Sequence, residues 1–118
     1  MFDWSRYVIL AEELAARTQD EAALRSAVSR AYYGVFGKTR ELLRAEGVSL
    51  PASGRVHRLI WRQCRSATEP RRRHLGLAGD WLRDKRNAAD YGDSLSDLPL
   101  LAGDSIRVAR EMLRFLEQ

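Results

Sequence analysis

The sequence predicts an all-α protein, an antiparallel up-and-down bundle of four to five helices. Apolar residues recur at the three- and four-residue spacing of a helix through most of the chain. No segment alternates in the manner of a strand. The connections between the helical stretches are short, which favours antiparallel neighbours. We expect residues 1–118 to form a single domain, because this length suffices for one core but not for two.

The first helix is expected from about Trp4 to Arg17, with Asp3 as its N-cap. Asp20 is suited to cap the second helix, which extends to about Glu46. Gly47 follows as a natural residue just beyond a helix C-terminus. This second helix contains the stretch RSAVSRAYYGVF, around which we expect the fold to be organised.

The central helix has two distinct faces. Its apolar stripe holds Leu24, Ala27, Val28, Ala31, Tyr32, Val35, Phe36, Leu42 and Leu43. Its other face holds Ser26, Ser29, Arg30, Tyr33, Gly34 and Gly37. Because glycine lowers helix stability by about 1 kcal/mol relative to alanine, two glycines three apart indicate close approach of another backbone or of a ligand.

Three further helices are expected at about Arg55–Ser66, Arg71–Tyr91 and Leu98–Leu116. Pro70 suits the first turn of the second of these, and Gly92 ends it. Ser96 or Asp97 is the expected cap of the last helix. The short helix is expected to bury Val56, Leu59, Ile60, Gln63 and Cys64. Gly76 and Gly79 predict irregular first turns in the helix that contains them.

Composition and motifs exclude several classes of protein. With 45% hydrophobic and 31% charged residues, the chain is typical of a soluble globular protein. No apolar run is long enough to span a membrane and no signal peptide is visible, so we expect a cytoplasmic location. The lone Cys64 excludes an intramolecular disulfide and disfavours a zinc site. No phosphate-loop, dinucleotide-binding or metalloprotease motif is present, so no cofactor and no metal is expected.

Positive charge is concentrated between Gly54 and His74. Seven arginines against one acid, Glu69, give this segment +6, whereas the whole chain carries +4. Such a segment can attract a polyanion, with Arg71, Arg72 and Arg73 as candidate nucleic-acid contacts. It can equally be a solvated face whose arginines pair with acids elsewhere, or a surface for an acidic partner. His57 and His74 lack a carboxylate at i+4, so both are interpreted as surface histidines.

Two short polar stretches stand out from the helical pattern. One is Arg25-x4-Arg30-x-Tyr32-Tyr33, and the other is RNAADY, residues 86–91. Arg86 and Asp90 share a helix face. On an exposed face the pair would contribute less than about 1 kcal/mol. On an inner face it would form a polar patch that either specifies the fold or forms a site.

RSAVSRAYYGVF followed by LRDKRNAADYGD resembles the HEPN family of small helical nucleotide-binding domains, over essentially the whole chain. The resemblance implies a HEPN-like bundle that forms a homodimer. Many members are metal-independent ribonucleases, often the toxin encoded beside a minimal nucleotidyltransferase. In their usual signature an arginine, which stabilises phosphate charge, precedes by four to six residues a histidine, which handles the 2′-hydroxyl proton. Arg86 matches the arginine, but Asp90 and Tyr91 stand where the histidine is expected.

Three functions therefore remain open. The chain could bind RNA or a nucleotide as one member of a toxin–antitoxin or defence pair, with Arg30, Tyr33 and Arg86 as ligand-binding residues. It could be a non-catalytic interaction or dimerisation module in which the same residues only fix the bundle or its dimer seam. It could also be a metal-independent endoribonuclease, with Arg86, Asp90 and Tyr91 as catalytic residues.

Overall fold

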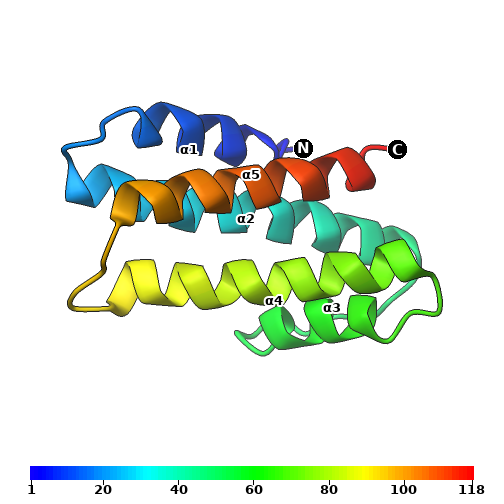
Figure 1. Ribbon diagram of the computed structural model, residues 1–118. Coiled ribbons are helices and arrows are strands. Elements are labelled where there is room, and N and C mark those ends of the chain that lie inside the picture. The colour runs from blue at the N-terminus through cyan, green and yellow to red at the C-terminus, as the bar shows by residue number, and fades with distance from the viewer.

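Five helices and no strand make up the computed structural model, which describes all of residues 1–118. The helices are α1 (Arg6–Ala15), α2 (Glu21–Ala45), α3 (Val56–Arg65), α4 (Pro70–Tyr91) and α5 (Leu98–Leu116). The all-α prediction is confirmed. Among the four helices α1, α2, α4 and α5, each runs antiparallel to the one before it, and the short α3 lies against the outer side of α4 (Figure 1).

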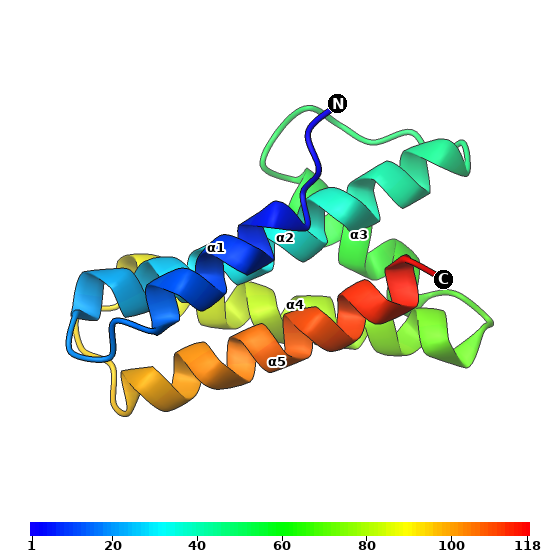
Figure 2. The ribbon, with the colours of Figure 1, turned by 90° about the horizontal axis from the view of Figure 1, so that it is seen from above.

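The central helix is α2, which packs against α1, α4 and α5. Figure 2 shows α1 lying along α2, with α5 beside this pair; α5 contacts both α1 and α2, whereas α4 contacts α2 and α5 but not α1. The predicted apolar stripe is buried along nearly its whole length, and it contributes Leu24, Ala27, Val28, Ala31, Tyr32, Val35, Phe36 and Leu43 to the core. The 3.6-residue period of these side chains is therefore what places α2 in the middle of the bundle.

Local capping residues define the starts of α2 and α4. The Asp20 carboxylate accepts a hydrogen bond from the Ala23 amide at 3.1 Å. The Glu69 carboxylate accepts bonds from the amides of Arg71 and Arg72 at 2.9 and 2.8 Å. These bonds satisfy amides that have no partner inside the helix.

The first helix is shorter than predicted, because the residues around Asp3 form a tighter turn. The Asp3 carboxylate accepts bonds from the amide and the hydroxyl of Ser5, at 3.1 and 2.6 Å. The Arg6 amide donates to the Asp3 carbonyl, three residues back, so regular α-helix begins at Arg6. At α5 Asp97 is the N-cap residue, as predicted, but it adopts a left-handed conformation (φ 50°) and its side chain accepts no capping hydrogen bond.

The glycine pair in α2 marks a close approach, as predicted. A Cβ at Gly34 would lie 2.7 Å from Cγ2 of Val8, and one at Gly37 would overlap the Trp4 ring. The N-terminal turn and α1 therefore reach the α2 backbone only because these positions lack side chains.

The glycines of α4 play a similar role, and the expected irregular start of this helix is wrong. Helix α4 is continuous from Pro70, and Gly76 and Gly79 make room for α3. A Cβ at Gly79 would overlap the indole of Trp61, which is fully buried. The buried face of α3 accordingly includes Trp61, whereas Gln63, predicted to face inward, is exposed.

None of the five helices combines the length and the apolar run that crossing a bilayer requires.

Candidate functional site

The two polar motifs meet between α2 and α4. The Ser29 hydroxyl donates to Oδ2 of Asp90 at 3.3 Å. The guanidinium of Arg86 lies 5.4 Å from the centroid of the Tyr33 ring, and that of Arg30 lies 5.0 Å from the same centroid. Tyr33 therefore contacts two cations, one from each motif.

Arg86 is the most unusual charged side chain of this cluster. Only 8% of the residue is exposed, and its guanidinium lies 5.3 Å from the Tyr32 ring centroid. Its acidic neighbour is Asp90, with 3.8 Å between Nη1 and Oδ2, which is too long for a hydrogen bond. The Nε atom is buried without any partner. The stacking of a desolvated guanidinium on an aromatic ring is worth about 2 kcal/mol, but it leaves the N–H donors unused.

An open pocket of about 370 Å³ lies beside Tyr33 on the side of Arg30. Arg30 stacks on Tyr7 as well, at 4.9 Å, and makes no ion pair. The N-terminal turn supplies one wall, because Trp4 packs over Gly37. The residues lining the pocket are Trp4, Tyr7, Ser26, Ser29, Arg30, Tyr33 and Asp90. A cation, hydroxyls and aromatic faces in one pocket are groups that can bind a phosphate and stack a base.

His57 joins this cluster from α3, and sequence reasoning missed it. The Trp61 indole N–H donates to the Tyr32 hydroxyl at 3.1 Å. That hydroxyl lies 2.7 Å from Nδ1 of His57. A hydroxyl that accepts from the indole can donate to Nδ1, which assigns the proton of a neutral imidazole to Nε2. The ring stacks on Phe36 with 4.1 Å between centroids.

Burial and positive charge keep His57 neutral. Burial is the largest influence, followed by the charges of Arg86, Arg83 and Arg40, and together they lower its pKa to about 4. Burial also raises the pKa of Tyr32 to about 12. Both groups are therefore uncharged at neutral pH, and the cluster's positive charge resides on arginines alone.

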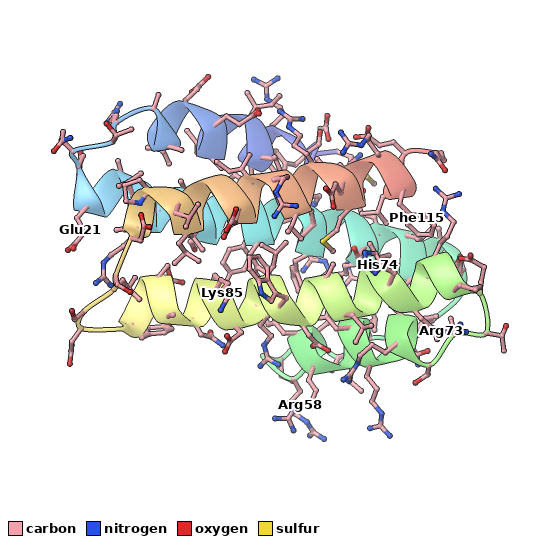
Figure 3. All side chains as sticks on the ribbon, viewed as in Figure 1. Glu21, Arg58, Arg73, His74, Lys85 and Phe115 are labelled. Atoms are coloured by element: carbon pink, nitrogen blue, oxygen red, sulfur yellow. The ribbon has the colours of Figure 1, made fainter.

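The remaining predicted site residues lie elsewhere. Tyr91 is 77% exposed and does not line the pocket. Arg72 forms two hydrogen bonds with Glu46, at 3.0 and 2.8 Å. Arg73 donates to backbone carbonyls of the loop before α4. Arg71 stacks on Phe115, with 5.1 Å from Cζ to the ring centroid. Figure 3 shows Arg73 and Phe115 at the end of the bundle where α4 begins, together with the exposed side chain of Arg58 on α3.

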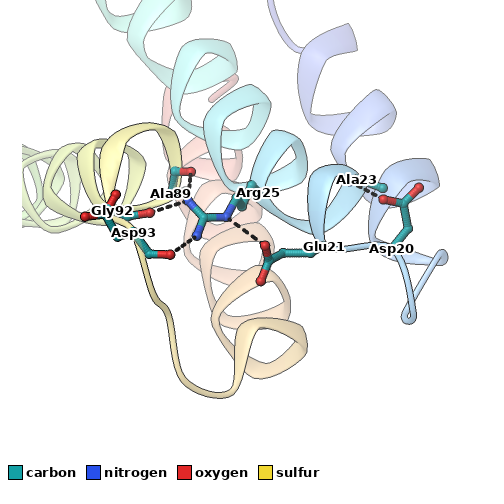
Figure 4. A network of polar contacts seen from close by, with 7 residues as sticks. All are labelled: Asp20, Glu21, Ala23, Arg25, Ala89, Gly92 and Asp93. Carbon is teal, nitrogen blue, oxygen red and sulfur yellow. Dashed lines mark hydrogen bonds and ion pairs between the residues drawn. The ribbon is translucent and has the colours of Figure 1, made fainter.

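Arg25, the first residue of the α2 motif, has a structural role. Its Nη1 donates to the carbonyls of Ala89 and Gly92, at 3.0 and 2.6 Å, and Nη2 lies 3.5 Å from the Asp93 carbonyl (Figure 4). Glu21 lies 3.7 Å from Nε. A cation here satisfies carbonyls at the C-terminus of α4 and complements the helix dipole. This network fixes the end of α4 against α2, and with it the register that brings Arg86 to Tyr33.

A larger groove of about 800 Å³ lies between α4 and α5. Its lining is mainly apolar and includes Leu75, Trp81, Val108, Met112 and Phe115. Its polar lining residues are Arg71, His74, Arg107 and Glu111, and none of them belongs to either polar motif, so we place the candidate site at Tyr33 and Arg86 instead.

No group of three or more histidine, cysteine, aspartate or glutamate side chains is arranged to hold a metal ion. Comparison with known proteins finds no matching protein family, no similar curated protein and no similar solved structure.

Proposed function

We propose that the protein binds RNA or a nucleotide through Arg30, Tyr33 and Arg86, as a HEPN-like member of a toxin–antitoxin or defence pair. The main support is the state of Arg86, a buried guanidinium whose Nε has no partner and whose carboxylate neighbour is 3.8 Å away. A buried charge is stable only when it is compensated, so an anion supplied by a ligand would complete its surroundings.

The chemistry of the cluster suits a nucleotide rather than a simple ion. A guanidinium presents a planar fork of donors that matches two phosphate oxygens. Tyrosine rings offer faces on which bases stack, at about 1–3 kcal/mol per base in single-stranded complexes. Arg30 and Tyr33 border the open pocket, so a base or backbone segment there would lie next to Arg86.

Replacing Arg86 by alanine tests this proposal. We expect the affinity for a short single-stranded RNA, measured by fluorescence anisotropy, to fall at least about tenfold, because a charge-assisted bond contributes about 1.5–3 kcal/mol. Arg58→Ala is the control, because Arg58 is exposed on α3 and makes no ion pair. Equal RNA affinity in the Arg86→Ala and wild-type proteins would contradict the proposal.

A non-catalytic interaction module is the alternative, and the Arg25 network favours it because much of the motif already serves the fold. In that case Arg86→Ala lowers the melting temperature or breaks a dimer and leaves no binding phenotype. We expect a homodimer, for which the exposed Leu77 (58%) and Trp81 (37%) are the apolar residues of interest on α4. Sedimentation velocity of wild-type protein and Leu77→Glu decides between monomer and dimer.

A metal-independent ribonuclease is the second alternative, supported by the position of His57. This histidine contacts Tyr32 and Tyr33, the same rings that Arg86 stacks on. Cleavage of RNA in EDTA that disappears in both Arg86→Ala and His57→Asn would establish this activity. The resemblance further implies a minimal nucleotidyltransferase as partner and a cytoplasmic location. Co-purification with the product of a neighbouring gene of that type tests the partnership.

A further inference from the structure

We propose that Arg83, Arg86 and His57 form a subsite for a dianionic phosphate group, such as the terminal phosphate of a nucleotide or of an oligonucleotide. This inference rests on the proposed function and makes it more specific, because it places the phosphorylated end of the ligand on the α3 side of Tyr33. The subsite draws on three helices: α4 supplies both arginines, α3 supplies His57, and α2 supplies the aromatic rings between them.

Of the arginines around His57, only Arg86 has an acidic partner, Asp90. The Nε atoms of Arg40, Arg83 and Arg86 are all buried without a hydrogen-bond partner. Buried donors left unpaired are rare in native proteins, so an acceptor that reached these three nitrogens would be bound favourably. The side chain of Arg86 is only 10% exposed. Neither Arg40 nor Arg83 makes an ion pair. The acids next to Arg83 along α4 pair with other cations, Asp80 with Arg65 and Asp84 with Lys85.

The three groups of the subsite share the same aromatic surroundings. The Arg86 guanidinium lies 5.3 and 5.4 Å from the ring centroids of Tyr32 and Tyr33. The His57 ring lies 5.7 and 5.9 Å from the same two centroids. Arg83 precedes Arg86 by three residues on α4, so the two side chains lie on the same side of the helix. The charge of Arg83 also contributes to the lowered pKa of His57.

His57 adds a neutral donor to the cations. Its Nδ1 lies 2.7 Å from the Tyr32 hydroxyl. When that hydroxyl donates to Nδ1, the neutral ring carries its proton on Nε2. Nε2 makes no hydrogen bond within the protein and is not fully buried. An anion at this place would accept bonds from one imidazole and from guanidinium groups.

The local charge balance distinguishes a phosphate monoester from a diester. The charges that act on His57 are those of Arg86, Arg83 and Arg40. Asp90 pairs with Arg86, and the opposite charges of Arg44 and Glu41 beside Arg40 offset each other. Two positive charges therefore remain. A phosphate monoester carries close to two negative charges at neutral pH, whereas a diester of the RNA backbone carries one. The monoester balances the site and the diester does not.

The test compares two versions of one short single-stranded RNA, with and without a terminal phosphate, at about pH 7.5, where the monoester is a dianion. We expect the phosphorylated RNA to bind at least about tenfold more tightly, as one additional charge-assisted bond would give. Arg83→Gln should abolish this preference while the binding of unphosphorylated RNA persists. Arg58→Gln, on the exposed side of α3, is the matched control and should keep the preference.

Inorganic phosphate supplies a second measurement that does not depend on RNA. Its addition should shift the His57 imidazole signals in the NMR spectrum of the wild-type protein and leave them unshifted in Arg83→Gln. Arg83→Lys, which keeps the charge without the planar fork, should show a reduced shift and serves if the glutamine variant fails to fold.

The outcomes separate the two proposals. Equal affinity for both RNAs, with no response of His57 to phosphate, overturns the subsite and leaves the proposed function standing. A response of His57 to phosphate without any RNA binding retains the anion subsite and overturns the proposed function. Absence of both responses in a folded protein overturns both.

Discussion

The Arg25 guanidinium donates a 2.6 Å hydrogen bond to the carbonyl of Gly92, which joins the first residue of one motif to the segment that follows the other. The same Nη1 atom also binds the Ala89 carbonyl at 3.0 Å. Carbonyls in the last turn of a helix have no partner within it, so a guanidinium that serves two of them stabilises the helix end. The geometry at Arg86 depends on this contact, because the last turns of α4 are held against α2 there.

Replacement of Arg25 by methionine should therefore destabilise the fold. We expect a loss of about 1.5–3 kcal/mol, the usual contribution of hydrogen bonds to a charged donor, in urea denaturation followed by circular dichroism. Arg58→Met, an exposed arginine without an ion pair, should change stability by less than about 0.5 kcal/mol. A similar loss in both variants would show that the α4 contact is not the cause.

Protonation of His57 should make stability depend on pH between about 4 and 6.5. The pKa of His57 is lowered to about 4 in the folded protein, mainly by burial, against 6.5 for the free side chain. Between these values the unfolded chain binds a proton that the folded chain does not, so stability rises with pH across this range and falls on acidification. The loss of stability is complete below the pKa of His57 in the folded protein and absent above its pKa in the unfolded chain.

His57→Asn isolates this contribution, because asparagine can accept the Tyr32 hydrogen bond but does not titrate. We expect the difference in unfolding free energy between wild type and variant to change with pH only in that window. Other groups, such as Glu46, whose pKa is lowered chiefly by its hydrogen bond from Arg72, cancel in the difference. A difference that is constant with pH would contradict the assignment.

Alanine substitutions at three helical glycines are expected to change stability in opposite directions. Gly37→Ala and Gly79→Ala each place a Cβ into an indole ring, that of Trp4 or that of Trp61. Overpacking of this kind costs about 1–3 kcal/mol, so both variants should melt at lower temperature. A Cβ at Gly103 in α5 meets no atom within 4 Å, so Gly103→Ala should stabilise by about 0.5–1 kcal/mol. Unchanged or higher melting temperatures for both indole-facing variants would mean that the tryptophans can move aside.

Helix positions could be predicted because their signals are local in sequence. Asp20 bonds to an amide three residues away, and Pro70 stands in the first turn of α4. The error at α1 has the same origin: Asp3 is not the N-cap of this helix, because Ser5 occupies that position and Asp3 binds Ser5 in a preceding turn. Boundaries that rest on one capping residue shift when that residue forms a turn instead.

The site was harder to predict because its contacts span the chain. Arg25 donates to carbonyls 64 and 67 residues away. Because these acceptors are backbone atoms, no pattern of side chains in the sequence indicates them. His57 shares a helix face with Ile60, Trp61 and Cys64 at offsets of three, four and seven. That spacing was the available signal, and it was obscured by arginines in the same segment, which suggested an exposed face.

In the basic segment, the contacts in the structure distinguish arginines that the composition alone treats as equivalent. Each arginine that neutralises an RNA phosphate contributes about one unit to the slope of log affinity against log salt concentration. Arg72 already holds Glu46 in two hydrogen bonds, and Arg73 holds loop carbonyls. Arg71, which makes no ion pair, is the member of the trio most available to a polyanion.

Replacing Arg71, Arg72 and Arg73 together by glutamine should therefore lower the salt slope of RNA binding by about one unit rather than three. Arg71→Gln alone should reproduce that change, and Arg72→Gln alone should leave the slope intact while weakening the contact with Glu46. Anisotropy titrations over a series of salt concentrations measure the slope. A loss of about three units would mean that Arg72 and Arg73 exchange their protein partners for phosphates. An unchanged slope would assign the whole trio to the fold, since Glu46, the loop carbonyls and Phe115 then account for all three guanidiniums.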